Sequence, residues 1–168
     1  MENMKYMKRP STGEVFAYEA DGNQDEFIPD GLTAMSEQEV NAHLNPITVP
    51  TGADVDAERD HRIDAGVEFQ GVMFQSRATD RENIAGAAQL GFMAIVGGAQ
   101  AGDLRWSNPD QDFAWIASDN SLVPMDAHTV VAFGKVAAER KQALIYAGRQ
   151  LKDMESVPAD FTDNKWWP

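Results

Sequence analysis

Histidines and carboxylates are the side chains of this chain that are best suited to acid–base or metal chemistry. The three histidines, His43, His61 and His128, lie far apart in the sequence. None has a second histidine four residues away, which is the spacing that lets one helix bring two imidazoles to a metal. Each lies on a polar stretch or near an expected helix end, so we interpret them as surface residues.

A run of alternating carboxylates resembles a metal site more closely. It comprises Asp54, Asp56, Glu58 and Asp60. On a helix these side chains would point in different directions around the axis and would not converge on one ion. A calcium-binding loop would need glycine at its sixth position, where this run has Arg59. We therefore interpret the run as a solvated helix face.

Nucleophiles and phosphate-binding loops are also not indicated. The chain has no cysteine and no Gly-x-Ser-x-Gly motif. Its glycine-rich segment, residues 97–102, follows an expected helix, whereas a phosphate-binding loop follows a strand and opens a helix. The sequence therefore predicts no catalytic residue, no metal site and no cofactor, and we expect that the protein is not an enzyme.

Four tryptophans fall into two pairs with different expectations. Trp106 and Trp115 lie in expected strands and are interpreted as core residues. The alternative is that they stack on a small ligand, in a binding or hydrolase domain, which would require a deep pocket with convergent polar groups.

Trp166 and Trp167 are adjacent on a polar segment, where we expect that they are hard to bury in one small domain. We predict that they contact a partner protein. Three aromatic residues of the expected N-terminal hairpin are further candidates for such contacts: Tyr6, Phe16 and Tyr18.

The charge and hydropathy of the chain narrow the choice of partners. The formal net charge is -13, spread along the sequence, which disfavours binding to nucleic acid. An acidic surface favours solubility or the binding of a basic protein partner. Assembly into a homo-oligomer is a further alternative. No segment has the roughly 18 consecutive apolar residues of a membrane helix. We expect no membrane association and a location in the cytoplasm.

An N-terminal module is expected over residues 1–45. Residues 5–9 and 14–18 predict two strands joined by a turn at residues 10–13. Ser36 and Glu39 predict a capping box, which opens a short helix that ends before Pro46. Residues 46–53 are then expected to form a linker.

A tight hairpin followed by a helix is the most informative pattern in the rest of the chain. A two-residue turn at Gln70-Gly71 pairs Phe69 with Val72 and Val67 with Phe74, which puts all four apolar side chains on one face. A capping box at residues 79–82 is expected to start the helix, and Gly97-Gly98 to end it. One side of this helix carries small residues, including Gly86, Ala87, Gly91 and Ala94.

A second hairpin and a long helix follow. Residues 104–106 and 113–117 predict strands, and residues 122–125 an edge strand because they contain Pro124. Asp126 is expected to cap a final helix that Pro158 closes. With a short helix over residues 54–63, the fold class is α+β: an N-terminal hairpin and helix, then a compact ββα-ββα-type domain over residues 54–155 and an acidic, aromatic tail over residues 156–168.

The hairpin–helix unit resembles a domain of unknown function found in tail and tail-fibre assembly proteins of tailed bacteriophages. The resemblance covers roughly residues 54–155. The residues that carry it are Gly66, Val67, Phe69, Gly71, Phe74, Arg81, Ile84, Gly86, Ala87, Trp115, Asp119, Asn120, Leu122, Val123, Leu151 and Lys152. The family pattern has an acidic residue after the hairpin, where this chain has Gln75-Ser76. The N-terminal module is similar to the start of tail-fibre assembly proteins through Phe16, Tyr18, residues 28–30, Met35, Ser36 and Glu39.

This resemblance implies a bacteriophage protein that acts at the tail fibre or the baseplate by protein–protein contact. Two roles are implied. An assembly factor, or chaperone, would bind the fibre in the host cytoplasm and help it to trimerise. A structural component would stay in the virion tail. The residues discussed above do not choose between the two roles.

Overall fold

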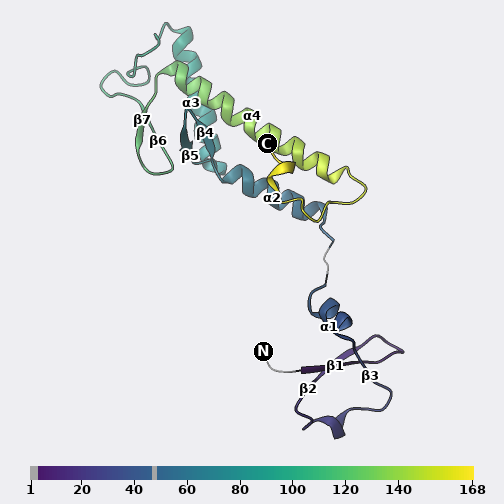
Figure 1. Ribbon diagram of the computed structural model, residues 1–168. Helices are drawn as coiled ribbons and strands as arrows, with labels where there is room; N and C mark the ends of the chain where they lie inside the picture. Colours follow the sequence, from purple (N-terminus) through teal and green to yellow (C-terminus); the bar gives the residue numbers. More distant parts are fainter. Residues whose placement is uncertain (1–3, 47–48) are drawn as a thin grey trace. The chain divides into compact units, whose positions relative to one another are not determined.

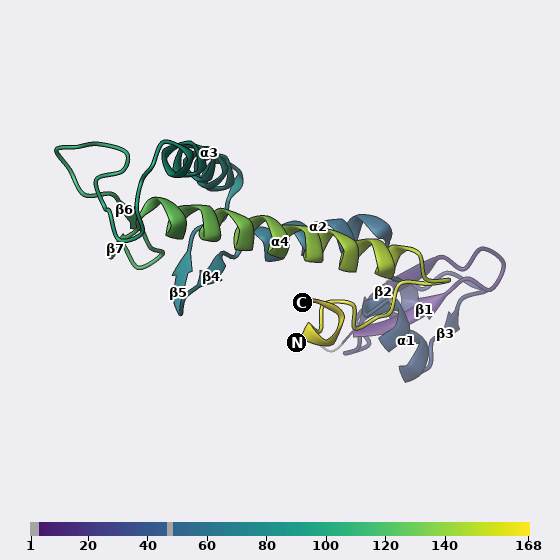
Figure 2. The same ribbon diagram turned by 90° about the horizontal axis from the view of Figure 1, so that it is seen from above.

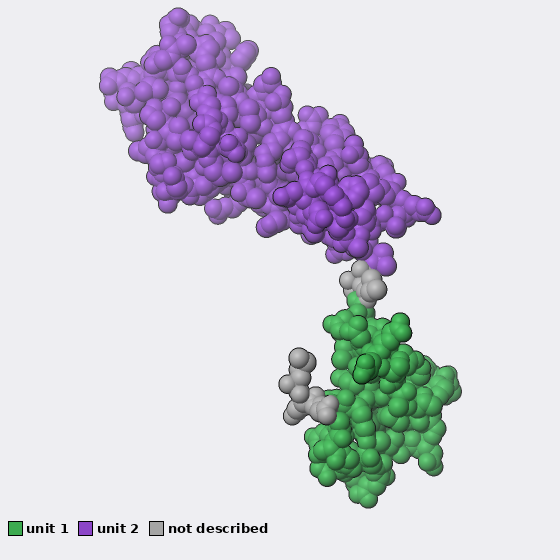
Figure 3. Space-filling model, viewed as in Figure 1, with its two compact units in different colours: residues 1–48 green, residues 49–168 purple. Residues whose placement is uncertain are grey.

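The computed structural model describes residues 4–46 and 49–168, which divide into two compact units, residues 1–48 and 49–168 (Figure 3). Residues 47–48 of the expected linker lie outside the described residues. Residues 52–53, which were also expected in the linker, belong to a helix. Residues 156–168, which the sequence predicted as an acidic, aromatic tail, pack within unit 2. The predicted α+β class is confirmed.

Unit 1 is a three-stranded antiparallel sheet with one helix. Its strands are β1 (Met4–Lys8), β2 (Val15–Glu19) and β3 (Thr33–Ala34), in the order β2-β1-β3. The sequence predicted β1 and β2, whereas the two-residue β3 was not predicted. A short 3₁₀ turn, η1 (Asp25–Phe27), precedes β3, and helix α1 (Glu37–Leu44) ends the unit. The predicted capping box of α1 is confirmed, because Ser36 and Glu39 each accept a backbone hydrogen bond from the other.

Unit 1 has no fully enclosed core among its described residues. No side chain described between residues 4 and 46 is buried. Polar contacts join the helix to the sheet: Lys8 on β1 pairs with Glu39 on α1, and the rings of Tyr6 and His43 meet edge to face at 6.4 Å. A domain of this size buries a small share of its surface and has correspondingly little hydrophobic stabilisation.

Unit 2 is built along one long helix. Helix α4 (Ala127–Lys152) contacts α3 (Ala78–Val96) and α2 (Gly52–Asp64), with α3 beside its first half and α2 beside its second half (Figures 1 and 2). Hairpin β4–β5 (Val67–Phe69, Val72–Phe74) precedes α3, and hairpin β6–β7 (Ala114–Ile116, Leu122–Pro124) precedes α4. The unit is therefore a ββα-ββα arrangement, which α2 precedes in the sequence.

The predicted register of the β4–β5 hairpin is confirmed. Phe69 pairs with Val72 and Val67 with Phe74. Both turn residues have positive φ, 51° at Gln70 and 77° at Gly71, which is the turn whose twist matches that of two antiparallel strands. The hairpin thereby turns its apolar face toward the core.

Three local predictions for unit 2 need correction. Helix α2 starts at Gly52, capped by Thr51, and Asp54 completes the capping box. Helix α3 starts at Ala78, and Asp80 accepts a hydrogen bond from the backbone N–H of Arg77 at 2.9 Å, so the cap lies two residues before the predicted one. Residues 104–106 form turns and no strand, because β6 pairs with β7 instead.

Two clusters of buried side chains lie along α4. The first joins both hairpins to the first half of α4 and contains Val67, Phe69, Phe74, Ile84, Ala117, Met125, Val130 and Phe133. The second joins α2 and the C-terminal segment to the second half of α4 and contains Val55, Ile63, Leu144, Leu151 and Trp167. Helix α4 ends at Lys152, before the predicted stop at Pro158.

Helices α3 and α4 approach closely because small residues meet between them. A Cβ added at Gly91 would lie 3.0 Å from the backbone oxygen of Ala127 and 3.4 Å from Val131. A Cβ added at Gly134 on α4 would overlap Ala88 on α3. The predicted close contact of the small-residue side is therefore present at Gly91, whereas Gly86 is exposed and faces open space.

The ion pair of Lys8 and Glu39 predicts an acid-sensitive unit 1. Hydrogen bonds from the Lys8 ammonium and then from Ser36 lower the pKa of Glu39 to about 2. A carboxyl group with a lowered folded-state pKa stabilises the fold above its unfolded pKa, and this stabilisation is lost as the pH falls toward 2. We expect the side-chain carboxyl ¹³C resonance of Glu39 to titrate below the usual glutamate range. Lys8→Met should raise that midpoint, and a wild-type midpoint near 4.3 would contradict the ion pair.

Two glycine substitutions test the close helix contact. We expect Gly91→Leu to lower the free energy of unfolding by about 1–3 kcal/mol, because its side chain would push α3 away from α4. Gly86→Leu on the same helix should instead raise it by about 0.5–1 kcal/mol, because glycine is unfavourable inside a helix. Urea denaturation measures both variants. Equal effects at the two positions would show that no close contact exists.

Candidate functional site

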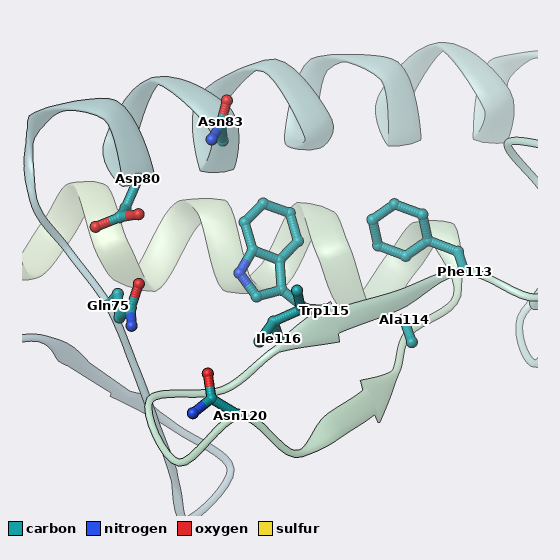
Figure 4. A pocket seen from close by; sticks show the side chains of 8 residues that line it. All are labelled: Gln75, Asp80, Asn83, Phe113, Ala114, Trp115, Ile116 and Asn120. Carbon is teal, nitrogen blue, oxygen red and sulfur yellow. The ribbon is translucent and has the colours of Figure 1, made fainter.

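A cleft of about 470 Å³ opens beside β6 in unit 2 (Figure 4). Strand β6 provides one wall, and the start of α3 with the residue after β5 provides the other. Most of the polar groups are amides, and one is a carboxylate. The residues that line the cleft are Gln75, Asp80, Asn83, Phe113, Ala114, Trp115, Ile116 and Asn120.

The hydrophobic core beneath the cleft holds its aromatic wall in place. Trp115 is half-buried, and its ring meets the fully buried ring of Phe133 at 5.5 Å, in an edge-to-face arrangement. Phe113 lies 4.9 Å from the ring of Trp106, whose Nε1–H donates to the carbonyl of Met125 at 3.0 Å. Both tryptophans pack against the core, as predicted, while Trp115 also faces the cleft.

The polar groups of the cleft come from local structure around it. Asp80 is held by the backbone N–H of Arg77, whose guanidinium Nε lies 3.8 Å from the same oxygen. Asn120 has a φ of 67° in the β6–β7 turn, a conformation that asparagine tolerates better than most residues. Gln75 presents a neutral amide to the cleft.

A second candidate surface is the outer side of α3. Four large apolar side chains project there, each more than half exposed: Leu90 59%, Phe92 60%, Met93 61% and Val96 74%. We call these four residues the α3 outer face. Exposed apolar residues are ordinary when scattered, but a contiguous group on one helix is typical of an interaction site.

The α3 outer face lies in a part of the sequence without charge. Residues 83–102 contain no Asp, Glu, Lys, Arg or His, although the chain carries a net charge of -13. This surface was not predicted from the sequence. The uncharged run was its available signal, but apolar and small residues surround the helix on all sides, so the pattern alone does not say which side faces outward.

The C-terminal tryptophans differ from their prediction. Trp167 is only 6% exposed, and its Nε1–H donates to the carbonyl of Phe161 at 2.7 Å. The guanidinium of Arg62 lies 5.2 Å from its ring. The expectation that both tryptophans are hard to bury is thus corrected for Trp167, because α2 and α4 enclose its ring. Trp166 is half-buried and donates to Asp160, and its predicted partner contact stays a prediction.

The three aromatic candidates of unit 1 lie on two different faces of the sheet. Phe16 and Tyr18 pair with Met7 and Lys5, which places them on one face, whereas Tyr6 pairs with Ala17 on the other. Tyr6 contacts α1 through His43. The structure therefore brings Phe16 and Tyr18 together and separates Tyr6 from them.

Residues with metal or proton chemistry do not gather in the described part of the chain. No group of three or more His, Asp or Glu side chains is close enough there to hold a metal ion. His61 and His128 are exposed, and His43 contacts Tyr6. No helix among the described residues is long and apolar enough to cross a membrane.

Comparison with known proteins identifies one family. Residues 49–164 match the family described as a domain of unknown function (DUF4376), a range that covers α2, α3, α4 and both hairpins of unit 2. Neither the curated proteins nor the solved structures contain a match to the chain.

The burial of Trp167 predicts a structural role that Trp166 does not share. We expect Trp167→Ala to lower the free energy of unfolding by about 3–5 kcal/mol, because a large cavity would form between α2 and α4. Trp166→Ala should cost about 1 kcal/mol, since its ring is half-buried. Urea denaturation of both variants measures the difference. Equal, small losses of unfolding free energy in the two variants would show that Trp167 is not a core residue.

Proposed function

The chain belongs to the DUF4376 family, and we propose that it is a bacteriophage tail protein that binds a tail-fibre or baseplate protein. The proposal joins the resemblance of residues 54–155 to phage tail and tail-fibre assembly proteins with the surface chemistry of unit 2. The protein acts by contact between surfaces and carries out no reaction of its own.

The α3 outer face is the observation that carries this proposal. Its four side chains are large, apolar and mostly exposed, and no charged residue lies within residues 83–102. Removing such side chains from water on binding is favourable by roughly 25 cal/mol per Å² of apolar surface. Phe92 and Met93 are residue types enriched at the centres of protein interfaces.

Unit 1 offers a second reason to expect a protein partner. Its sheet has no buried side chain among the residues described, so it gains little stability from its own packing. Phe16 and Tyr18 lie on the sheet face opposite Tyr6, which contacts α1. A partner that covered this face would supply the burial that unit 1 lacks.

We favour an assembly factor that works in the host cytoplasm over a permanent part of the virion. An assembly factor shields apolar surface and exposed strand edges of a fibre until the fibre has trimerised, and an apolar helix face suits that transient contact. Mass spectrometry of purified particles separates the two roles. Absence of the chain from the particle supports the assembly factor, and presence at a fixed copy number supports the structural component.

Substitution of the α3 outer face tests the proposed contact. We expect the double variant Phe92→Gln and Met93→Gln to lose capture of the tail-fibre or baseplate protein by about tenfold or more on co-expression, because the apolar centre of the contact is removed. Its thermal midpoint should stay close to that of the wild type, since both side chains are exposed.

A matched control lies on α4. Ile145 and Tyr146 are 42% and 60% exposed, so Ile145→Gln with Tyr146→Gln removes comparable apolar surface elsewhere on unit 2. This control should capture the partner as the wild type does. Equal capture by the α3 variant and the control would refute the role of the α3 outer face.

A further inference from the structure

The open edge of β6 presents backbone hydrogen-bonding groups to the cleft. The N–H of Met125 donates to the carbonyl of Phe113 at 3.1 Å, and the N–H of Ala117 donates to the carbonyl of Ser121 at 2.9 Å. These are two hydrogen-bonded pairs of the β6–β7 ladder, and in an antiparallel ladder such pairs alternate with pairs that face outward. The N–H and C=O groups of Ala114 and Ile116 therefore point away from β7.

These outward groups lie on the side where the cleft opens. Ala114 and Ile116 both line it, together with Trp115 between them. The N–H of Ser118, just after β6, donates to the carbonyl of Met73 on β5 at 2.9 Å. This hydrogen bond joins the end of the β6 segment to β5. The two hairpins are thus linked at one end, and the cleft separates them further along.

The chemistry of the opposite wall suits a peptide backbone. Gln75 and Asn83 each carry an amide that both donates and accepts hydrogen bonds, as a peptide group does. Asp80 is the one charged side chain among the residues that line the cleft, and the whole chain carries a net charge of -13. A segment bearing Lys or Arg would complement both.

We propose that the cleft binds an extended, basic peptide segment of a partner protein, which adds a strand to the open edge of β6. The peptide backbone pairs with the outward groups of Ala114 and Ile116, in the manner of other strand additions to open sheet edges. Trp115 provides an apolar wall, and a Lys or Arg of the segment faces Asp80. The cleft and the α3 outer face are made of different residues, so the two proposed contacts are tested independently.

Selection from a random peptide library tests the proposal on the full chain. Ten-residue peptides displayed on their messenger RNA are selected against the protein, and enriched peptides are synthesised for fluorescence anisotropy. We expect enriched peptides to carry Lys or Arg and to bind in the micromolar range. Ala114→Pro removes one outward N–H of β6 and should weaken binding by about tenfold, as the loss of a buried hydrogen bond predicts.

Leu122→Pro is the matched control, because Leu122 lies on β7 and its N–H faces the other side of the hairpin. It should change the affinity by less than about twofold. A second measurement needs no variant protein. Methylation of a peptide N–H that pairs with β6 should weaken binding to the wild type, whereas methylation of the next residue's N–H should not.

Three results would overturn the proposal. One is the enrichment of no peptide at all. Another is binding that neither Ala114→Pro nor N-methylation at any position affects. The third is binding of the neutral trisaccharide maltotriose in the cleft, seen as shifted Trp115 and Asn83 resonances, with no competition from the peptides, which would make the cleft a saccharide site.

Discussion

The close approach of α3 and α4 is the contact on which the rest of unit 2 depends. At Gly134 an added Cβ would overlap Ala88, and at Gly91 it would be crowded against the backbone of Ala127. Small residues therefore fill the space between the helices around Gly91 and Gly134. Ile84 near the start of α3 is buried in the core, whereas the four residues of the α3 outer face lie exposed. The later turns of α3 thus depart from the usual amphipathic arrangement, in which the large apolar side chains of a surface helix face the core.

The same helix organises both candidate surfaces. Its first turns supply Asp80 and Asn83 to the cleft, and its later turns carry the α3 outer face. The hydrogen bonds of Arg81 to the Ser76 carbonyl and to Asp64 hold the start of α3 against the end of α2. A change in the distance between α3 and α4 would consequently alter both surfaces together.

The helix α4 carries two core clusters with different neighbours. One holds the hairpins and the other holds α2 and the C-terminal segment. Arg140 lies in the sequence between them and donates to the carbonyl of Arg62 at 3.0 Å. Burial, and then the positive charge of Arg62, lower the pKa of Arg140. The hydrogen bond from Arg140 to the Arg62 carbonyl thus joins α4 to α2.

Local signals could be predicted from the sequence, and contacts between distant segments could not. The β4–β5 register follows from Gln70-Gly71 and four alternating apolar residues, and the caps at Ser36 and Asp126 follow from their residue types. The start of α3 was predicted two residues late, because its N-cap residue, Arg77, is not of a type that usually caps helices. Residues 104–106 have the residue types of a strand, but β6 pairs with β7 and not with them.

Burial of Trp167 was not foreseeable, because its enclosure needs α2, α4 and the carbonyl of Phe161 at once. The two candidate surfaces were missed for a related reason. The outward side of α3 depends on which small residues meet α4, and the open edge of β6 depends on which strand pairs with it. Both are choices of tertiary packing, which single-sequence periodicity does not contain.

Carbene footprinting of the chain, alone and in complex with the tail-fibre or baseplate protein, tests the central claim most directly. The account predicts strong labelling of Phe92 and Met93 in the free chain and its loss in the complex, while Met154, which is 39% exposed and distant in sequence, stays labelled in both. Weak labelling of α3 in the free chain, or labelling that the partner leaves unchanged, would contradict the claim that small residues turn the large apolar side of α3 outward for binding.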